Sequence, residues 1–339
     1  MAASTPVLEI KELEIAFRSG NKDTIYAVNG VSLKAFQKRT LGIAGESGCG
    51  KSVTAHSVLK LLPGNSRFRG GEITYTGRDE IPVSIERLPA DGKEMRRIRG
   101  KEIGMIFQDP MASLNPVYSI GDQLKEKLLE NEKISKIEAG ERSAEILEKL
   151  GISNARERMK RYPHEFSGGM KQRAMIAMAM INNPQLLIAD EPTTALDVTI
   201  QAQILDLMMD VQKETHVAII IITHNMGILT QMADDIAIMY MGRIVEYGTK
   251  EQLFRNPLHP YTQALLKCVP VLGAQKGRLV TIEGGTPDPR EKIRGCAFAS
   301  RCEKRTAKCG EECPATFAIE GNRTVECFLY SDKTREVNS

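Results

Sequence analysis

The chain has 339 residues, of which 42% are hydrophobic, and a formal net charge of +3 at neutral pH. This is enough apolar material for one large core and a smaller appendage, and the small net charge gives no argument for binding nucleic acid or an anionic membrane surface. No apolar run approaches the roughly 18 residues of a membrane span, and the N-terminus lacks a secretory signal pattern. We therefore expect a cytosolic protein whose membrane role depends on partners.

Strand and helix patterns alternate along the first part of the chain. Period-two alternation predicts strands at 7–17 and 27–36. A short apolar strand at 41–44 is expected to lead through a Gly-rich loop into a helix at 52–62, which stops at Pro63. Further patterns predict a strand at 103–107 and a Lys- and Glu-rich helical segment at 121–152.

The second part continues the alternation and then changes composition. Ser167 can cap a helix that runs to Asn183. Apolar strands at 186–190 and 217–223 flank a helix at 198–214, which predicts an α/β sheet with a helical insertion. The stretch 270–294 is typical of a linker, and a Cys-rich tail follows it. We expect three parts, at 1–255, 256–295 and 296–330.

The segment GESGCGKS fits the pattern of a phosphate-binding loop between a strand and a helix. Backbone N–H groups in such a loop curl around phosphates, and the helix N-terminus adds positive potential. Lys51 is expected to reach the β- and γ-phosphates and the Ser52 hydroxyl to bind Mg²⁺. An incidental Gly-rich turn is the alternative, which the flanking strand and helix disfavour. The residues expected to contact ATP are Gly45, Ser47, Gly48, Cys49, Gly50, Lys51 and Ser52.

Polar residues at the ends of three further strands suit the same chemistry. Asp190 ends an apolar strand and is expected near the hydrated Mg²⁺, and Glu191 can polarise or deprotonate the attacking water. Gln108 can contact Mg²⁺ or the water, and His224 can hold the γ-phosphate. Each of these residues alone is common at the end of a strand. Their order along the chain, together with the phosphate loop, indicates a site for nucleotide hydrolysis.

A second possible anion site lies at the start of the helix after Phe166. Ser167, Gly168 and Gly169 are small, so backbone N–H groups there can approach an anion closely. One chain with one phosphate loop has no obvious use for this, unless it serves the γ-phosphate of a neighbouring subunit's ATP. A plain Ser cap with flexible glycines is the alternative.

These motifs together resemble the ABC ATPase family over the first 250 or so residues. The order is GESGCGKS, the Gln of IFQDP, FSGGM, LLIADEP, the Asp197 of ALD and the His of ITH. The resemblance implies a RecA-like core with an antiparallel β subdomain and a helical subdomain. It also implies that two domains sandwich two ATPs, with 167–169 acting in trans as the signature. Phe17 matches the aromatic residue that stacks on adenine, Tyr26 is a weaker candidate, and a core aromatic is the alternative for both.

Local phrases resemble the ATP-binding subunits of oligopeptide and dipeptide importers. They are GMIFQDPMASLNPV, YPHEFSGGMKQR, NPLHPYTQALL and GCAFASRC. The resemblance implies a second, non-identical ATPase subunit, two membrane permeases and an external binding protein, with the chain at the cytoplasmic face of the cell membrane. Other cargo (oligosaccharide, nickel or an opine) and a soluble ABC ATPase acting on nucleic acid or ribosomes are the alternatives.

Five of the seven cysteines lie in the tail. Reduced, clustered thiols in a cytosolic protein indicate metal before disulfides, and the spacing alone does not choose between Zn²⁺ and an iron–sulfur cluster. The subfamily resemblance implies a [4Fe–4S] cluster, with Cys313 left out of the ligand set and with unligated thiols as the alternative. Cys49 and Cys268 are expected to be plain small side chains. The implied ligands are Cys296, Cys302, Cys309 and Cys327.

Overall fold

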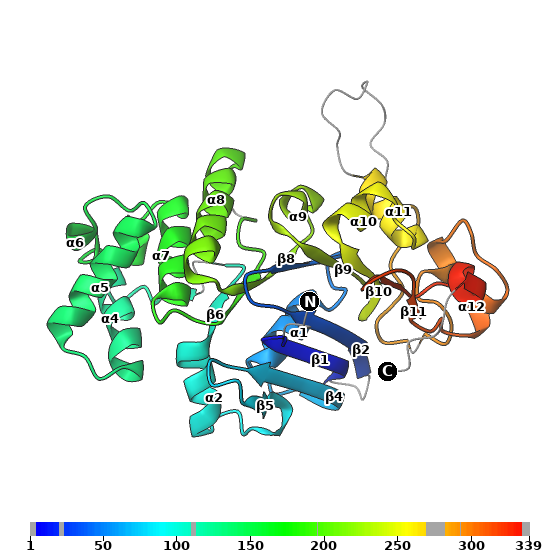
Figure 1. Ribbon diagram of the computed structural model, residues 1–339, viewed down its shortest axis with the longest axis horizontal. Helices are drawn as coiled ribbons and strands as arrows, with labels where there is room; N and C mark the ends of the chain where they lie inside the picture. The colour runs from blue at the N-terminus through cyan, green and yellow to red at the C-terminus, as the bar shows by residue number, and fades with distance from the viewer. Residues whose placement is uncertain are drawn as a thin grey trace. The chain divides into compact units, whose positions relative to one another are not determined.

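The computed structural model describes residues 5–19, 24–109, 113–194, 196–268, 282–291 and 293–333. Most of the expected linker at 270–294, the Ala of the ALD motif and part of IFQDPMASLNPV lie outside these ranges. The chain divides into two units, which are described separately with the labels of Figure 1. Unit 1 comprises 75–222, the N-terminus up to Leu8, and 35–40, and unit 2 comprises 9–34, 41–74 and everything from Thr223 onward.

Unit 1 is organised around three parallel strands, β6 (Ile103–Ile106), β7 (Leu186–Asp190) and β8 (Ala218–Thr223). β7 pairs with β6 on one side and β8 on the other. All residues of the three strands are buried, which explains their continuous apolar runs, because a parallel sheet is covered on both faces. Helices α7 (Gly168–Met180) and α8 (Val198–Thr215) belong to the same unit, close to the expected bounds.

The helical segment expected at 121–152 is two helices rather than one, α4 (Ile120–Asn131) and α5 (Lys136–Lys149). Glu132 leaves the helical conformation, and the Ser135 hydroxyl accepts a hydrogen bond from the Glu138 N–H at 3.1 Å to cap α5. Arg142 on α5 donates to both carboxylate oxygens of Glu132 and so connects α5 to the end of α4. The remaining elements of unit 1 are β5 (Pro82–Ser84), η1 (Ile85–Arg87), α2 (Lys93–Arg97), the π-helix η2 (Ile98–Glu102), α6 (Ala155–Arg158) and η3 (Pro163–Glu165).

Lys127 on α4 is a half-buried cation whose ammonium donates to the Met178 carbonyl, in the last turn of α7, at 2.7 Å. Burial lowers the pKa of Lys127 from 10.5 to about 8. Between these values the unfolded chain binds more protons than the folded one, so the free energy of unfolding rises with pH across this window. We expect Lys127→Met to remove this rise, a loss on the order of 2 kcal/mol by roughly pH 10.

Urea unfolding of both proteins at roughly pH 7.5 and roughly pH 10 measures this difference. Lys125→Met on the same helix is the control, because Lys125 is partly exposed in an ion pair with Asp122. Equal pH dependence in wild type and Lys127→Met would show that this lysine does not titrate as described.

Unit 2 contains two groups of strands. In the first, β1 (Leu8–Arg18) lies between β2 (Thr24–Ala35) and β4 (Ser66–Thr76). In the second, β3 (Thr40–Ala44) runs parallel to β9 (Asp235–Tyr240), which pairs antiparallel with β10 (Arg243–Thr249). The helices of unit 2 are α1 (Lys51–Val58), α9 (Met226–Met232), α10 (Lys250–Arg255), α11 (Pro260–Lys267), η4 (Ala299–Arg301), α12 (Lys308–Glu311) and η5 (Phe328–Lys333).

The helix after the phosphate loop ends earlier than expected, at Val58, and Lys60 then adopts a left-handed conformation with φ of 51°. None of the helices in the described part of the chain is both long and apolar enough to cross a bilayer.

The Cys-rich tail extends the sheet of unit 2. Strand β12 (Thr324–Val325) pairs antiparallel with β10, and β11 (Phe317–Ala318) pairs with β12. The side chains of Phe317 and Val325 pack with Leu258 in a small buried cluster. Arg323 also donates to the carboxylate of Glu246, which is fully buried, at 2.7 Å. The tail therefore shares a core with the preceding segment, although its composition indicates too little apolar material for a core of its own.

Candidate functional site

The phosphate loop connects β3 to α1, as the sequence predicts. Its glycines lie against neighbouring backbone: a Cβ at Gly45 would be 2.1 Å from the Met239 carbonyl oxygen, and one at Gly50 would be 2.3 Å from that of Ala27. Gly50 also has φ of 104°, a conformation that disfavours other residues. The close approach to β9 and β2 therefore requires glycine at both positions and fixes where the loop enters α1.

Lys51 is the first residue of α1 and is only 5% exposed. Its ammonium donates to the carbonyls of Gly45 and Glu46 at 2.8 and 2.9 Å, so the cation is held by the loop itself. An ammonium at the N-terminus of an eight-residue helix provides the charge that a polyphosphate needs. Ser52 follows Lys51 on the same helix. Burial raises the pKa of the neighbouring Cys49 thiol, which favours its neutral form.

The other predicted residues of unit 2 lie on separate elements. His224 is exposed directly after β8, where the neighbouring Asn225 caps α9 by accepting from the Gly227 N–H at 2.9 Å. Phe17 is half-buried on β1. The guanidinium of Arg69 lies 5.5 Å from the centroid of the Tyr26 ring, so one face of this weaker adenine candidate already carries a cation.

Unit 1 brings Gln108 and Glu191 together. The Gln108 amide donates to Oε2 of Glu191 at 3.0 Å, and the Thr194 hydroxyl donates to the same oxygen at 2.9 Å. Glu191 adopts a left-handed backbone with φ of 47°, and its N–H donates to the Ile222 carbonyl at the end of β8. Such a conformation is uncommon for a residue with a side chain and is typical of functional turns. Asp190, the last residue of β7, is 2% exposed.

Sequence reasoning missed Thr194. It lies three residues after Glu191 and donates to the same carboxylate oxygen as Gln108, and neither of these two contacts was among the sequence-based expectations. A carboxylate held in this way can accept a proton from a water molecule placed on its other side.

The signature segment begins α7 as expected. The Ser167 hydroxyl accepts from the Met170 N–H at 3.3 Å, which is the capping arrangement named above as the alternative. A Cβ at Gly169 would lie 2.9 Å from the Ile200 side chain on α8, and Asp197 caps α8 by accepting from the Ile200 N–H. The first turns of α7 and α8 thus pack closely. The Ser167 cap is compatible with the expected contact of residues 167–169 with the ATP of a second subunit.

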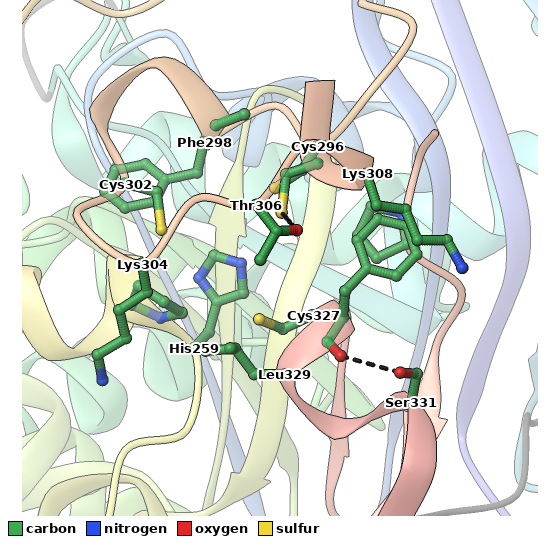
Figure 2. A pocket seen from close by; sticks show the side chains of 15 residues that line it. His259, Cys296, Phe298, Cys302, Lys304, Thr306, Lys308, Cys327, Leu329 and Ser331 are labelled. Atoms are coloured by element: carbon green, nitrogen blue, oxygen red, sulfur yellow. Dashed lines mark hydrogen bonds between the residues drawn. The ribbon is translucent and has the colours of Figure 1, made fainter. Parts of the chain in front are cut away.

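Four tail cysteines line a single pocket of about 190 Å³. Figure 2 shows three of them labelled, together with His259 and Phe298, which also line the pocket. The exposed Cys313 lines a different pocket. Cys313 therefore lies apart from the other four tail cysteines. These four are Cys296, Cys302, Cys309 and Cys327.

Burial dominates the electrostatics of this pocket. It raises the pKa of the Cys296 thiol to about 12 and also raises the pKa values of Cys302 and Cys327, with the other thiols adding to the shift of Cys296. Within the described residues, no three His, Cys, Asp or Glu side chains converge on a point suited to a single metal ion. The pocket thus groups the four cysteines around a common space.

A strand, a glycine loop with a buried lysine, and a strand end with an oriented Glu define a phosphate-loop nucleoside triphosphatase. The ABC transporter family matches residues 28–194, and the C-terminal region of oligopeptide/dipeptide transporters matches 245–309. The chain belongs to the ABC ATPases, among the ATP-binding subunits of oligopeptide and dipeptide transporters.

Individual relatives are similar in sequence to nearly the whole chain. It is 45% identical over 96% of its length to the dipeptide transport ATP-binding protein DppD of Bacillus subtilis, matching 96% of that protein. It is 46% identical over 97% of its length to OppD, the oligopeptide transport ATP-binding protein of the same organism, matching 90% of it. Among solved structures, the ATP-binding cassette MJ0796, a post-hydrolysis dimer bound to ADP and Pi, gives a TM-score of 0.62 at 25% identity, covering 71% of this chain and 98% of the other.

Proposed function

We propose that the chain drives import of peptides across the cell membrane by hydrolysing ATP, as one of two ATPase subunits attached to membrane permeases. The observation that carries the proposal is the match of residues 245–309 to the C-terminal region of oligopeptide/dipeptide transporters, beyond the ATPase domain. The Bacillus relatives named for dipeptide and oligopeptide transport support the same cargo. The proposed division is an ATPase domain at 1–255, a segment at 256–295 and a Cys-rich tail at 296–330.

Within unit 1, Glu191 is the proposed general base for the attacking water. Gln108 and Thr194 orient its carboxylate, which supports the assignment. Asp190 and Gln108 are the proposed Mg²⁺ ligands of this unit, and Ser52 is separately the proposed Mg²⁺ ligand of unit 2, each assigned from its own motif. A bound Mg²⁺ would neutralise charge on the phosphates.

Within unit 2, Lys51 is proposed to pair with the phosphates after leaving the carbonyls of Gly45 and Glu46. The loop 45–50 and the N-terminus of α1 surround the phosphates with N–H groups. His224 is proposed to contact the γ-phosphate, and Phe17 to stack on adenine.

Residues 167–169 are proposed to complete the ATP site of a second, non-identical ATPase subunit. The dimeric state of MJ0796 supports such an arrangement. We expect the isolated chain to hydrolyse ATP at least about 10-fold more slowly than the assembled complex, because each site lacks half of its charge-stabilising groups. Steady-state hydrolysis at matched concentrations measures this, and full activity in a monomer verified by light scattering would contradict it.

The remaining proposed partners are two permeases and an external binding protein, which place the chain at the cytoplasmic face of the membrane. The test is ATP hydrolysis by the complex reconstituted with its binding protein and challenged with peptides, oligosaccharides, opines or Ni²⁺. Stimulation by peptides alone supports the proposal. Stimulation by another cargo, or by nucleic acid or ribosomes in the absence of permeases, replaces it with the corresponding alternative.

We propose further that the four-thiol pocket holds a [4Fe–4S] cluster. Grouping of the four cysteines in one pocket supports the proposal. Buried thiolates repel one another, so a cationic centre is what would stabilise them together. The cluster would supply a covalent cross-link between η4 and the turn after β12, a structural role.

Anaerobically purified protein is expected to contain iron and acid-labile sulfide. Serine in place of Cys296 removes one ligand and should lower the iron content by at least about half, because such a site depends on all of its thiolates. Cys313→Ser is the matched control and should leave the iron unchanged, since its thiol lies in another pocket. One zinc per chain would replace the cluster with a zinc site, and protein without metal under anaerobic conditions would rule out both.

A further inference from the structure

Glu46, the second residue of the phosphate loop, is anchored in three ways. Its N–H donates to the Tyr261 hydroxyl at 2.9 Å, and its carbonyl accepts from the Lys51 ammonium at 2.9 Å. Its carboxylate accepts from Arg301 at both oxygens, at 2.8 and 3.0 Å. The backbone, side chain and neighbouring lysine of one loop residue are therefore tied to other elements of unit 2.

Arg301 comes from the Cys-rich tail, 255 residues away from Glu46 along the chain. Its side chain is 5% exposed, and all three of its nitrogens donate hydrogen bonds. Besides Glu46, the acceptors are the Tyr240 hydroxyl and the carbonyls of Ile282 and Glu283. The hydrogen bonds to Glu46 raise the pKa of Arg301 above its usual range. A buried, fully paired guanidinium has one favourable geometry, so it fixes the position of the carboxylate that it holds.

Three packed rings connect this anchor to the thiol pocket. Phe298 lies 5.4 Å from both Tyr240 and Tyr261, measured between ring centroids, and the two tyrosines lie 4.6 Å apart. Phe298 also lines the pocket of the four cysteines (Figure 2). Arg301 ends the short helix η4, and Cys302 follows it directly. Phe298 therefore belongs to the wall of the thiol pocket and also packs against Tyr261, whose hydroxyl holds the phosphate loop.

We propose that Arg301 is a positioning residue for nucleotide binding: it reaches from the tail and, through Glu46, holds the phosphate loop in the conformation that accepts ATP. A loop rich in glycine has many accessible conformations, so an external anchor lowers the entropy that is lost when phosphate orders it. The same contact makes nucleotide affinity depend on the fold of the tail. The contact between Arg301 and Glu46 itself requires no particular group in the thiol pocket.

The test is a double-mutant cycle read out as the dissociation constant for ATP, measured by calorimetry on the purified full chain. Arg301→Gln and Glu46→Gln are each expected to weaken ATP binding roughly 3- to 30-fold. The double variant should bind ATP no more weakly than the single variant with the lower affinity, because both substitutions break the same contact. Arg301→Lys keeps the charge but loses the paired geometry, so an intermediate affinity is expected.

Arg290→Gln is the matched control, because Arg290 also donates to both carboxylate oxygens of an acidic residue, Asp288, but at the surface. This variant should leave the ATP affinity unchanged. In the assembled complex, the Arg301 variants should raise the KM for ATP and change kcat less than about twofold. Unchanged ATP affinity in Glu46→Gln, or a lowered melting temperature without a change in affinity, would overturn the proposal. Additive losses in the double variant would likewise contradict action through Glu46.

Discussion

Glu191→Gln is expected to lower ATP hydrolysis by the assembled complex roughly 100-fold or more while leaving ATP binding intact, within the range for lost general-base catalysis. Gln108 and Thr194 both donate to Oε2 of Glu191. A glutamine carbonyl oxygen accepts the same two hydrogen bonds, so the side chain should keep its place and lose only its basicity. Single-turnover hydrolysis with excess enzyme isolates this step from product release.

The control for Glu191→Gln is Glu214→Gln at the end of α8, where the carboxylate is half-exposed in a surface ion pair with Lys149. This variant should hydrolyse ATP at the wild-type rate, because exposed ion pairs contribute little. Turnover near wild type in Glu191→Gln itself would remove Glu191 as the base.

Lys51→Ala is expected to weaken ATP binding roughly 10- to 100-fold, as the loss of a charge-assisted hydrogen bond to phosphate predicts. In the structure the ammonium is held by the carbonyls of Gly45 and Glu46, and it has to exchange these acceptors for phosphate oxygens. The net loss is therefore smaller than the full value of a new ion pair. Calorimetric titration with ATP gives the affinity directly.

Lys34→Ala serves as the comparison for Lys51→Ala, because Lys34 pairs with Glu9 at the surface of the same unit. Both variants need the wild-type melting temperature to within a few degrees, so that affinity and folding are separated. Equal ATP affinity of Lys51→Ala and wild type would contradict the role of the phosphate loop.

Local patterns predicted the nucleotide-site elements because each motif includes the structure that positions it. GESGCGKS needs a strand before it and a helix after it, and β3 and α1 are there. The apolar run before Asp190 is β7, and the Ser167 cap begins α7. The break between α4 and α5 was missed, although Ser135 followed three residues later by Glu138 is a pattern typical of the start of a helix.

Contacts distant along the chain leave no such signal. Glu46 occupies a position that the phosphate-loop pattern leaves open, and nothing in its surroundings indicates a partner 255 residues away. The pairing of Thr324 and Val325 with β10 was equally hidden, because a two-residue strand has no periodicity. The composition of the tail includes too little apolar material for a core of its own, and the structure gives the tail a core shared with Leu258.

The most direct test of the central claim is uptake of a labelled peptide by sealed vesicles that contain the reconstituted complex, with the binding protein outside and ATP inside. Wild-type complex should accumulate peptide only with hydrolysable ATP, and complex carrying Glu191→Gln should bind ATP and accumulate roughly 100-fold less in the same time. Peptide uptake that is independent of ATP, or that is unchanged by Glu191→Gln, would contradict the account of this chain as the motor.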